Sequence, residues 1–174
     1  MKKAVIGFFG VVLIGGLLAV GALFLIKDYD VYVVSGDAMY PTFAEGDRVV
    51  IDKSADAYER YDLIVFENAY GGGGYYIERI IGLPGETVQI QEGVIYINGE
   101  PLAEPYYYEA DFNGYDAYEE MMIGEGEYFV LGDNRNHSAD SRLNDFGMVK
   151  LESITGKAIF RMWPMDAIGS LQNQ

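Results

Sequence analysis

The sequence contains no cysteine and a single histidine, His137, among its 174 residues. Without cysteine the chain can form no disulfide, no thiolate nucleophile and no cysteine metal site, and one histidine excludes a multi-histidine metal site. Basic residues are also scarce, with 12 Lys and Arg against 27 Asp and Glu and a formal net charge of −15. Because such an acidic chain is repelled by nucleic-acid phosphates, we expect no nucleic-acid partner. We likewise assign no metal and no cofactor.

Charge is absent altogether from residues 4–26, which follow the basic start Lys2-Lys3. A helix of ~23 residues reaches ~35 Å, enough to cross a hydrocarbon core of ~30 Å. By the positive-inside rule we predict a single-pass protein of the cell membrane. Residues 1–27 form the cytoplasmic start and transmembrane signal anchor, and residues 28–174 lie outside the cytoplasm. A cleavable signal peptide is the alternative, because residues 19–22 offer small side chains, although signal h-regions usually run only ~7–15 residues.

Beyond residue 27 the chain consists largely of short segments rich in Val, Ile, Tyr and Phe, which is typical of strands. Glu92-Gly93 and Asn98-Gly99 predict two successive hairpin turns. The four glycines at 71–74 predict a hairpin tip, and residues 56–62 are compatible with one helical turn. The predicted fold class is therefore mainly β: one membrane helix followed by an antiparallel β-sheet domain. The predicted strands are residues 31–34, 48–52, 63–67, 75–81, 87–91, 94–97, 128–131 and 158–162.

Residues 101–128 are an acidic, Tyr-rich insertion and the least regular part of the sequence. Eight Asp and Glu and six Tyr fall in this segment, which has no Lys or Arg. One interpretation is a solvated, extended loop or a loose hairpin. The other is a surface for a basic partner, because tyrosines give contact area at low entropic cost.

Four motifs follow the hydrophobic segment in order. The first is Ser35-Gly36-Asp37-Ala38-Met39-Tyr40-Pro41-Thr42-Phe43, in which Gly36 and Pro41 bracket a tight turn after a predicted strand. The others are GDRVVIDK at 46–53, IERIIGLPGE at 77–86 and GDNRNHSADSR at 132–142. In this order, and behind a membrane segment, the motifs closely resemble the type I signal peptidase family, and the resemblance covers nearly the whole chain.

The resemblance implies a Ser/Lys dyad, with a serine nucleophile before Met39 and a lysine general base before Arg79. This sequence has Ala38 and Glu78 at those positions. A serine hydroxyl attacks only when a base removes its proton, and a lysine can be that base when burial lowers its pKa. Ala38 has no proton to give and no lone pair, so both reactive groups of the dyad are lost. The backbone N–H of Ala38 remains and could still bind a peptide carbonyl.

The resemblance also implies roles for the last motif and for the first turn. Ser138 would sit beside the former lysine position, Asp140 and Arg142 would form a structural ion pair, and the turn would be braced by neighbouring side chains. The implied groove accepts the extended chain of a secreted precursor. The bracing residues are Asp133, Asn134 and Arg135, and the oxyanion and groove residues are Gly36, Asp37, Met39, Tyr40 and Pro41, with Phe43 at its border. For the apolar members, ordinary core packing is the alternative.

Three arrangements could restore catalysis. Ser35 or Ser138 could replace the nucleophile, although attack requires near-ångström placement. Asp37 and Glu78 could act as a carboxylate pair, although short acidic residues more often stabilise turns. His137 could form a triad with Ser138 or Ser141, although neighbours in sequence rarely face each other on a loop.

Two functions follow. The first is a non-catalytic member of the protein export pathway that binds exported precursors as a chaperone or assembly factor. Pilin-like subunits are candidate clients, because the chain resembles inactive family members of pilus assembly systems. The second is an active signal peptidase that removes signal peptides from secreted preproteins. The missing dyad favours the first. The sequence leaves the oligomeric state open.

Overall fold

A computed structural model describes residues 28–106 and 117–171. The predicted membrane span, residues 4–26, lies outside the described residues. Within the described ranges, no helix is long and apolar enough to cross a bilayer. The described part is mainly antiparallel β-structure, as predicted.

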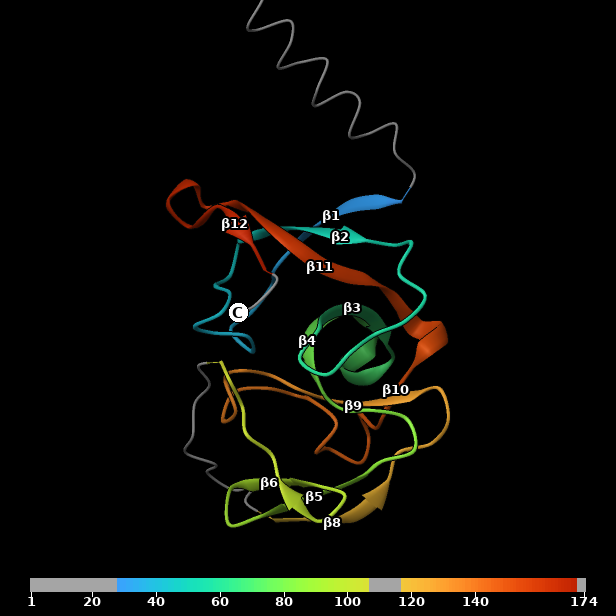
Figure 1. The fold of residues 1–174 in the computed structure, drawn as a ribbon. Helices are drawn as coiled ribbons and strands as arrows, with labels where there is room; N and C mark the ends of the chain where they lie inside the picture. The colour runs from blue at the N-terminus through green and yellow to red at the C-terminus, as the bar shows by residue number, and fades with distance from the viewer. Residues whose placement is uncertain (1–27, 107–116, 172–174) are drawn as a thin grey trace, which may run out of the picture.

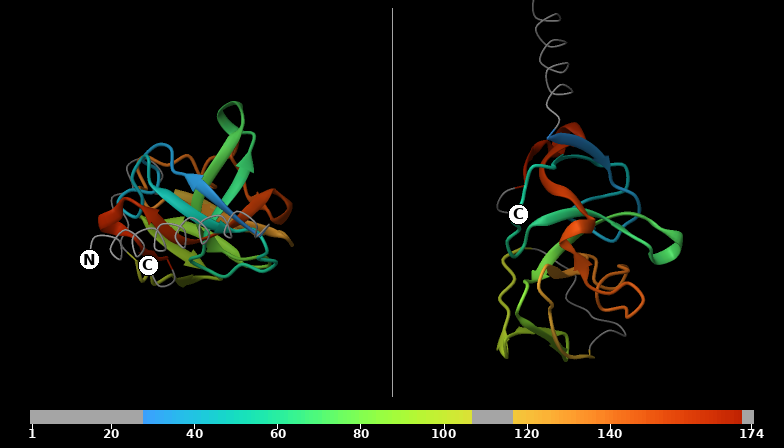
Figure 2. Two further views of the ribbon diagram at one scale, coloured as in Figure 1. Left: turned by 90° about the horizontal axis from the view of Figure 1, so that it is seen from above. Right: turned by 90° about the vertical axis from the view of Figure 1, so that its right-hand side faces the viewer.

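The larger sheet contains eight strands in the order β1-β2-β11-β3-β4-β9-β10, with β12 paired to β11 (Figure 1). All its pairings are antiparallel. The hairpin of β3 and β4 projects from the body of the molecule in both views of Figure 2. The bounds are β1 Tyr29–Val33, β2 Arg48–Asp52, β3 Leu63–Asn68, β4 Gly74–Gly82, β9 Glu127–Leu131, β10 Val149–Lys150, β11 Ile154–Trp163 and β12 Gly169–Ser170.

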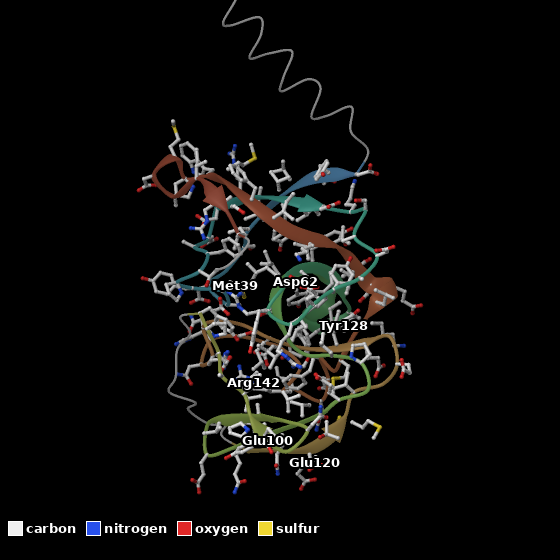
Figure 3. The ribbon with its side chains drawn as sticks, viewed as in Figure 1. Met39, Asp62, Glu100, Glu120, Tyr128 and Arg142 are labelled. Atoms are coloured by element: carbon white, nitrogen blue, oxygen red, sulfur yellow. The ribbon has the colours of Figure 1, made fainter. Side chains whose placement is uncertain are left out.

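The smaller sheet has four strands in the order β7-β6-β5-β8 and lies at the end of the molecule away from β1 (Figure 1). Glu100 and Glu120 are on this sheet (Figure 3). Its tight turns follow from the sequence, because Glu92-Gly93 and Asn98-Gly99 all have positive φ, as a two-residue hairpin turn requires. The bounds are β5 Thr87–Gln91, β6 Val94–Ile97, β7 Glu100–Pro101 and β8 Ala117–Met122, and the short 3₁₀ helices are η1 Tyr70–Gly72, η2 Leu151–Ser153 and η3 Met165–Ala167.

In the smaller sheet, the core is built from every second residue along the strands, the ones that face inward. In β5 and β6, Val88, Ile90, Ile95 and Ile97 are buried, whereas the residues between them are more exposed. They pack against Phe129 and other residues of the larger sheet, which joins the two sheets. Period-two alternation of this kind places one face of a strand in the core.

All eight predicted strand ranges are strands in the structure, with bounds that differ by a few residues. Four short or irregular strands were not predicted: β7, β8, β10 and β12. Residues 56–62 form no helix. The interpretation of residues 101–128 as a solvated loop is wrong for two parts of that segment, because β8 pairs with β5 and the side chain of Glu104 is buried.

The first half of β4 has a strand on one side only. Residues 74–78 pair with β3, whereas pairing with β9 begins at Arg79. The N–H and C=O of Ile80 bond towards the β3 side, to Asp62 and Tyr61. Because backbone direction alternates along a strand, the polar groups of Tyr75 and Ile77 point away from β3. We call this side of residues 74–78 the open edge, and among the described strands none pairs with it.

Candidate functional site

The turn after β1 carries Ala38. Gly36 has φ of 80°, a conformation that a residue with a Cβ rarely adopts. Gly36, Asp37, Tyr40 and Pro41 are exposed, and Ala38 is half-buried. Tyr40 is 59% exposed, whereas Met39 is only 1% exposed and belongs to the core with Phe43. The expectation that Met39 lines a groove is therefore wrong, because its apolar side chain packs inward.

The last motif fixes the backbone around Ala38. The N–H of Asn134 donates to the carbonyl of Ala38 over 2.9 Å, and its side-chain Nδ2 donates to the carbonyl of Asp37 over 2.9 Å. Gly132 allows this approach, because a Cβ there would lie 2.5 Å from the Ala38 oxygen and 2.5 Å from the Ser138 side chain. Two segments far apart in sequence therefore meet in backbone contact. No acceptor for the Ala38 N–H is present among the described residues.

Glu78 lies on β4 and is 1% exposed. The Ser138 hydroxyl donates to its Oε1 over 3.3 Å, and its Oε2 is buried without a hydrogen-bond partner. Burial raises the pKa of Glu78 well above its usual value of 4.5, and the charges of Asp140 and Asp133 raise it further. The hydrogen bond from Ser138 and the charge of Arg142 oppose this rise only in part. The geometry therefore favours a neutral carboxylic acid at Glu78.

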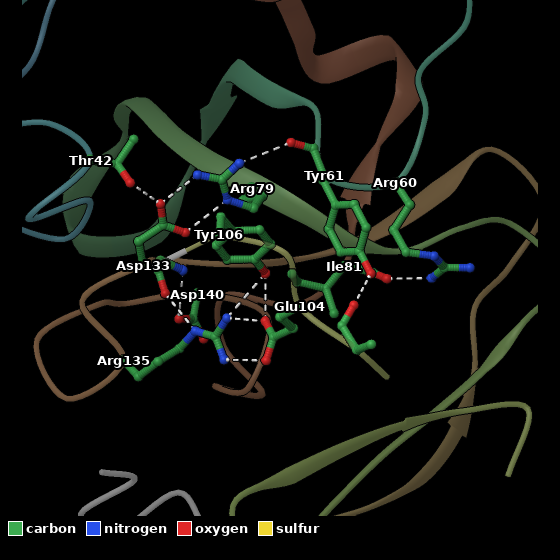
Figure 4. Close-up of polar contacts among 12 residues, drawn as sticks. Thr42, Arg60, Tyr61, Arg79, Ile81, Glu104, Tyr106, Asp133, Arg135 and Asp140 are labelled. Atoms are coloured by element: carbon green, nitrogen blue, oxygen red, sulfur yellow. Dashed lines mark hydrogen bonds and ion pairs between the residues drawn. The ribbon is translucent and has the colours of Figure 1, made fainter. Parts of the chain in front are cut away.

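Arg79, the next residue of β4, forms a buried ion pair with Asp133. Its Nε donates to Oδ1 over 2.9 Å and its Nη2 to Oδ2 over 2.6 Å (Figure 4). The Thr42 hydroxyl also donates to Asp133, which ties the first turn to the pair. The Tyr106 ring covers the guanidinium, with 3.9 Å between the Arg79 Cζ and the ring centroid. Asp133 and Asn134 therefore both bond to the first turn, through Thr42, Asp37 and Ala38.

Arg135 contacts the start of segment 101–128. Its guanidinium forms a buried ion pair with Glu104 and contacts the Tyr106 hydroxyl, while its Nε donates to the Gly132 carbonyl over 2.9 Å (Figure 4). Burial raises the pKa of Tyr106, and the neighbouring Glu104 adds to this. The start of segment 101–128 is therefore part of the structure that supports the site. No pattern in the sequence distinguishes Glu104 and Tyr106 from the other acidic and Tyr residues of that segment, so neither was predicted to be at the site.

The predicted ion pair of Asp140 and Arg142 is present and buried. Nε and Nη2 of Arg142 each donate over 2.8 Å to one carboxylate oxygen of Asp140. Nη2 of Arg142 also donates to the Arg135 carbonyl over 2.6 Å, and Asp140 accepts from the Gly132 N–H over 3.2 Å. The pair thus holds both ends of the 132–142 segment together. Its role here is to position Ser138 and the backbone beside Ala38.

The residues of the three arrangements that could restore catalysis differ in their burial and in their hydrogen bonds. Ser35 and His137 are exposed, and Asp37 is exposed whereas Glu78 is buried. Ser141 is buried and accepts from the Val130 N–H over 3.1 Å. Of the candidate residues of these three arrangements, Ser138 is the one whose hydroxyl is bonded to a carboxyl group at the site. Among the described residues, no group of three or more His, Asp and Glu side chains is arranged to hold a metal ion.

Tyr32 on β1 also reaches the site, although sequence analysis did not identify it. Its hydroxyl donates to the Tyr75 carbonyl over 3.1 Å and so links β1 to the open edge of β4. Burial raises the pKa of Tyr32, and the nearby Glu78 contributes to the rise. Tyr32, the open edge, Ala38 and Glu78 therefore belong to one region of the molecule.

The chain is similar to several known proteins. A family model described as signal peptidase, peptidase S26, matches residues 4–163. A signal peptidase I of Bacillus amyloliquefaciens is 36% identical over 160 residues, which cover 85% of this chain and 82% of that protein. Signal peptidase I S of Bacillus subtilis is 34% identical over 178 residues, covering 95% and 92%. A crystal structure of a signal peptidase I from Enterococcus faecalis V583 matches with a TM-score of 0.49 and 36% identity, covering 60% of this chain and 98% of that one.

Proposed function

The chain belongs to the signal peptidase, peptidase S26, family, and from this premise we propose that it binds exported precursor proteins without cleaving them. The observation that carries the proposal is the chemistry at the two dyad positions. A methyl group stands where the resemblance places the nucleophile, and a buried carboxyl group stands where it places the lysine base. A methyl group cannot attack a carbonyl carbon, so this pair cannot form an acyl-enzyme.

The peptide-binding parts of the site favour a binding function. The open edge of β4 offers the backbone groups of Tyr75 and Ile77, to which an extended peptide can add as a strand. The Ala38 N–H is held in place by the bonds that Asn134 makes to the adjacent carbonyls. An extended precursor paired with β4 therefore has a further backbone donor available where the resemblance places the oxyanion site.

We place the protein at the cell membrane, with residues 4–26 as a single span and the β domain outside the cytoplasm. Exposed apolar side chains support this placement, because they gather on β1, β11 and η3, at the end of the molecule where the described chain begins (Figure 1). They are Val31, Val33, Phe160, Met162, Trp163 and Met165, with Ile168 directly after η3. Protease protection of the full chain in oriented vesicles tests the topology, and cleavage of the β domain from the cytoplasmic side would contradict it.

The proposed clients are exported precursors, and pilin-like subunits are one class among them. That finer assignment rests on resemblance to inactive family members of pilus assembly systems. Its test is co-purification of the full chain with a pilin precursor, compared with a secreted precursor of another class. Equal retention of both would restrict the proposal to exported precursors in general.

The decisive experiment measures binding and cleavage together. Purified, detergent-solubilised full chain is mixed with a fluorescent precursor, binding is followed by anisotropy, and products are read by mass spectrometry. We expect saturable binding of the extended precursor and no cleavage product. Cleavage at a small-X-small site by the unmodified chain would overturn the non-catalytic function, and absence of binding would overturn the binding function.

One contact favours a second candidate function, an active peptidase with a relocated nucleophile. The Ser138 hydroxyl lies 3.3 Å from Glu78, a base when ionised. Against this, the Ser138 side chain packs closely over Gly132 beside the Ala38 carbonyl, and the raised pKa of Glu78 disfavours its basic form. Cleavage that is lost in Ser138→Ala but kept in Ser35→Ala would establish this second function.

A further inference from the structure

The buried Oε2 of Glu78 has no hydrogen-bond partner, although its twin Oε1 accepts from Ser138. A buried polar atom without a partner typically costs about 1–3 kcal/mol, so one that is retained requires an explanation, such as a role in binding or catalysis. The established parts of the fold do not require this carboxyl group, because Arg79 and Arg142 already have Asp133 and Asp140 as their ion-pair partners. The Oε2 atom of Glu78 is therefore available to form a hydrogen bond with a ligand.

The surrounding charges decide which ligand atom fits. From the 132–142 segment, Glu78 is faced by Asp133, Asp140 and Arg142, and from β1 by Tyr32. Asp133 is neutralised by Arg79 and Asp140 by Arg142, so an ionised Glu78 would leave one buried negative charge uncompensated. A protonated Glu78 leaves none. A neutral carboxyl whose Oε1 accepts from Ser138 has its own proton on Oε2, and that O–H needs an acceptor.

We propose that Glu78, as a neutral carboxylic acid, donates a hydrogen bond from Oε2 to a backbone carbonyl of the extended peptide bound at the open edge of β4. The replacement of the dyad lysine is then a gain of a peptide-binding donor, beside the second donor that the Ala38 N–H supplies. The inference rests on the proposed function and deepens it, because it names the ligand atom and makes peptide capture depend on proton binding at Glu78.

Tyr32 explains how the peptide reaches a buried atom. In the free protein its hydroxyl donates to the Tyr75 carbonyl, so the tyrosine occupies a backbone acceptor that points outward from the open edge. A peptide strand that pairs with β4 supplies its own N–H groups to these carbonyls and displaces the tyrosine hydroxyl. Tyr32 is half-buried and lies close enough to Glu78 for that carboxyl to affect its pKa. Displacement of Tyr32 therefore opens the side of the site where Glu78 lies.

The affinity for the peptide should therefore depend on pH. While Glu78 is protonated, the donor is present and the peptide binds. Ionisation removes the donor and leaves a negatively charged Oε2 that faces the partly negative carbonyl oxygen of the peptide. Once the pH exceeds the value at which Glu78 ionises in the free protein, affinity falls by up to about tenfold per pH unit, the limit for binding linked to one proton. Lower pH restores binding.

The test uses the full chain in detergent and a short alanine- and valine-rich peptide with blocked termini, which carries no ionisable group. Its Kd is measured from about pH 5 to about pH 9 for the wild type, Glu78→Gln, Glu78→Leu and the control Glu120→Gln, whose exposed side chain lies on β8 in the other sheet. We expect the wild type and Glu120→Gln to lose at least about tenfold in affinity as the pH rises. Glu78→Gln, which keeps a neutral donor, should bind at all pH values. Glu78→Leu should bind the peptide about threefold to tenfold more weakly than the wild type does at low pH, and its affinity should not change with pH.

Two readouts on the wild type do not depend on any variant folding. Infrared spectroscopy should show the carbonyl stretch of a protonated carboxylic acid that shifts when the peptide binds. A series of peptides in which one backbone amide at a time is replaced by a thioamide, an uncharged and weaker acceptor, should contain one member with a reduced pH dependence. Affinity that is independent of pH, with every thioamide peptide alike, would overturn the role of Glu78 while leaving peptide binding intact. A matched peptide with one lysine is measured in parallel, and affinity for it that rises with pH would overturn the proposal by showing that an ionised Glu78 binds an ammonium group. No binding at any pH would overturn the proposed function itself.

Discussion

Arg79 and Asp133 are 54 residues apart in sequence and joined by two hydrogen bonds, Nε to Oδ1 over 2.9 Å and Nη2 to Oδ2 over 2.6 Å. Both side chains are 1% exposed. This pair fixes the 132–142 segment against β4, one residue away from Glu78. The position of Ser138 relative to Glu78, and of Asn134 relative to Ala38, depends on it.

Removal of one partner of this pair should destabilise the fold strongly. In Arg79→Met, Asp133 keeps a buried charge that has lost its main partner, which typically costs about 3–5 kcal/mol. Chemical denaturation followed by circular dichroism measures the free energy of unfolding. The matched control is Lys53→Met, whose exposed partner Asp30 lies at 3.5 Å and should contribute less than about 1 kcal/mol. Equal effects of the two variants would contradict the assigned role of Arg79.

Glu78 should make the protein less stable as pH rises. Its pKa is raised in the folded state, so between its usual value of 4.5 and the raised value the folded state holds a proton that the unfolded state has lost. The free energy of unfolding then falls by about 1.4 kcal/mol per pH unit across that window and levels off above it. Glu78→Gln removes this slope, so its advantage over the wild type should be absent below pH 4.5 and grow with pH. Parallel curves for the two proteins would show that Glu78 titrates normally.

A side chain at position 132 should disrupt the contact between the two site segments. In Gly132→Ala the added Cβ would meet the Ala38 carbonyl and the Ser138 side chain at 2.5 Å, so one of them must move. We expect a loss of about 1–3 kcal/mol in unfolding free energy and weaker peptide binding. Gly169→Ala is the control, because a Cβ there meets nothing within 4 Å. If Gly132→Ala matches that control, the close packing at Gly132 is dispensable.

Restoration of the dyad should restore some cleavage. The double variant Ala38→Ser with Glu78→Lys supplies a hydroxyl and a buried amine whose pKa burial lowers, and Ser138 is already in place beside position 78. Precursor digestion read by mass spectrometry should show a product after a small residue, absent with either single variant. An inactive double variant that still folds would show that the supporting residues have moved away from a catalytic arrangement.

The sequence determined the strand pattern and the hairpin turns of this protein. Alternating apolar residues in segments such as 87–91 and 94–97 have one way to bury a face, and Asn98-Gly99 favours one kind of turn, so these features follow from local chemistry. The order of the four motifs was also sufficient to identify the family. That Ala38 and Glu78 stand where the resemblance places the dyad is a matter of residue type and needed no structure.

Only the tertiary structure decided which distant groups meet. The bond of Ser138 to Glu78 and the contact of Asn134 with Ala38 depend on pairing between β4 and β9, which no local pattern encodes. The side chain of Met39 is buried in the core and that of Tyr40 is exposed, because these neighbouring residues of the turn face opposite directions. Glu104 and Tyr106 belong to the site because Glu104 forms a buried ion pair with Arg135 and the Tyr106 ring covers the guanidinium of Arg79. Burial is likewise a property of the whole fold, and it is burial that raises the pKa of Glu78.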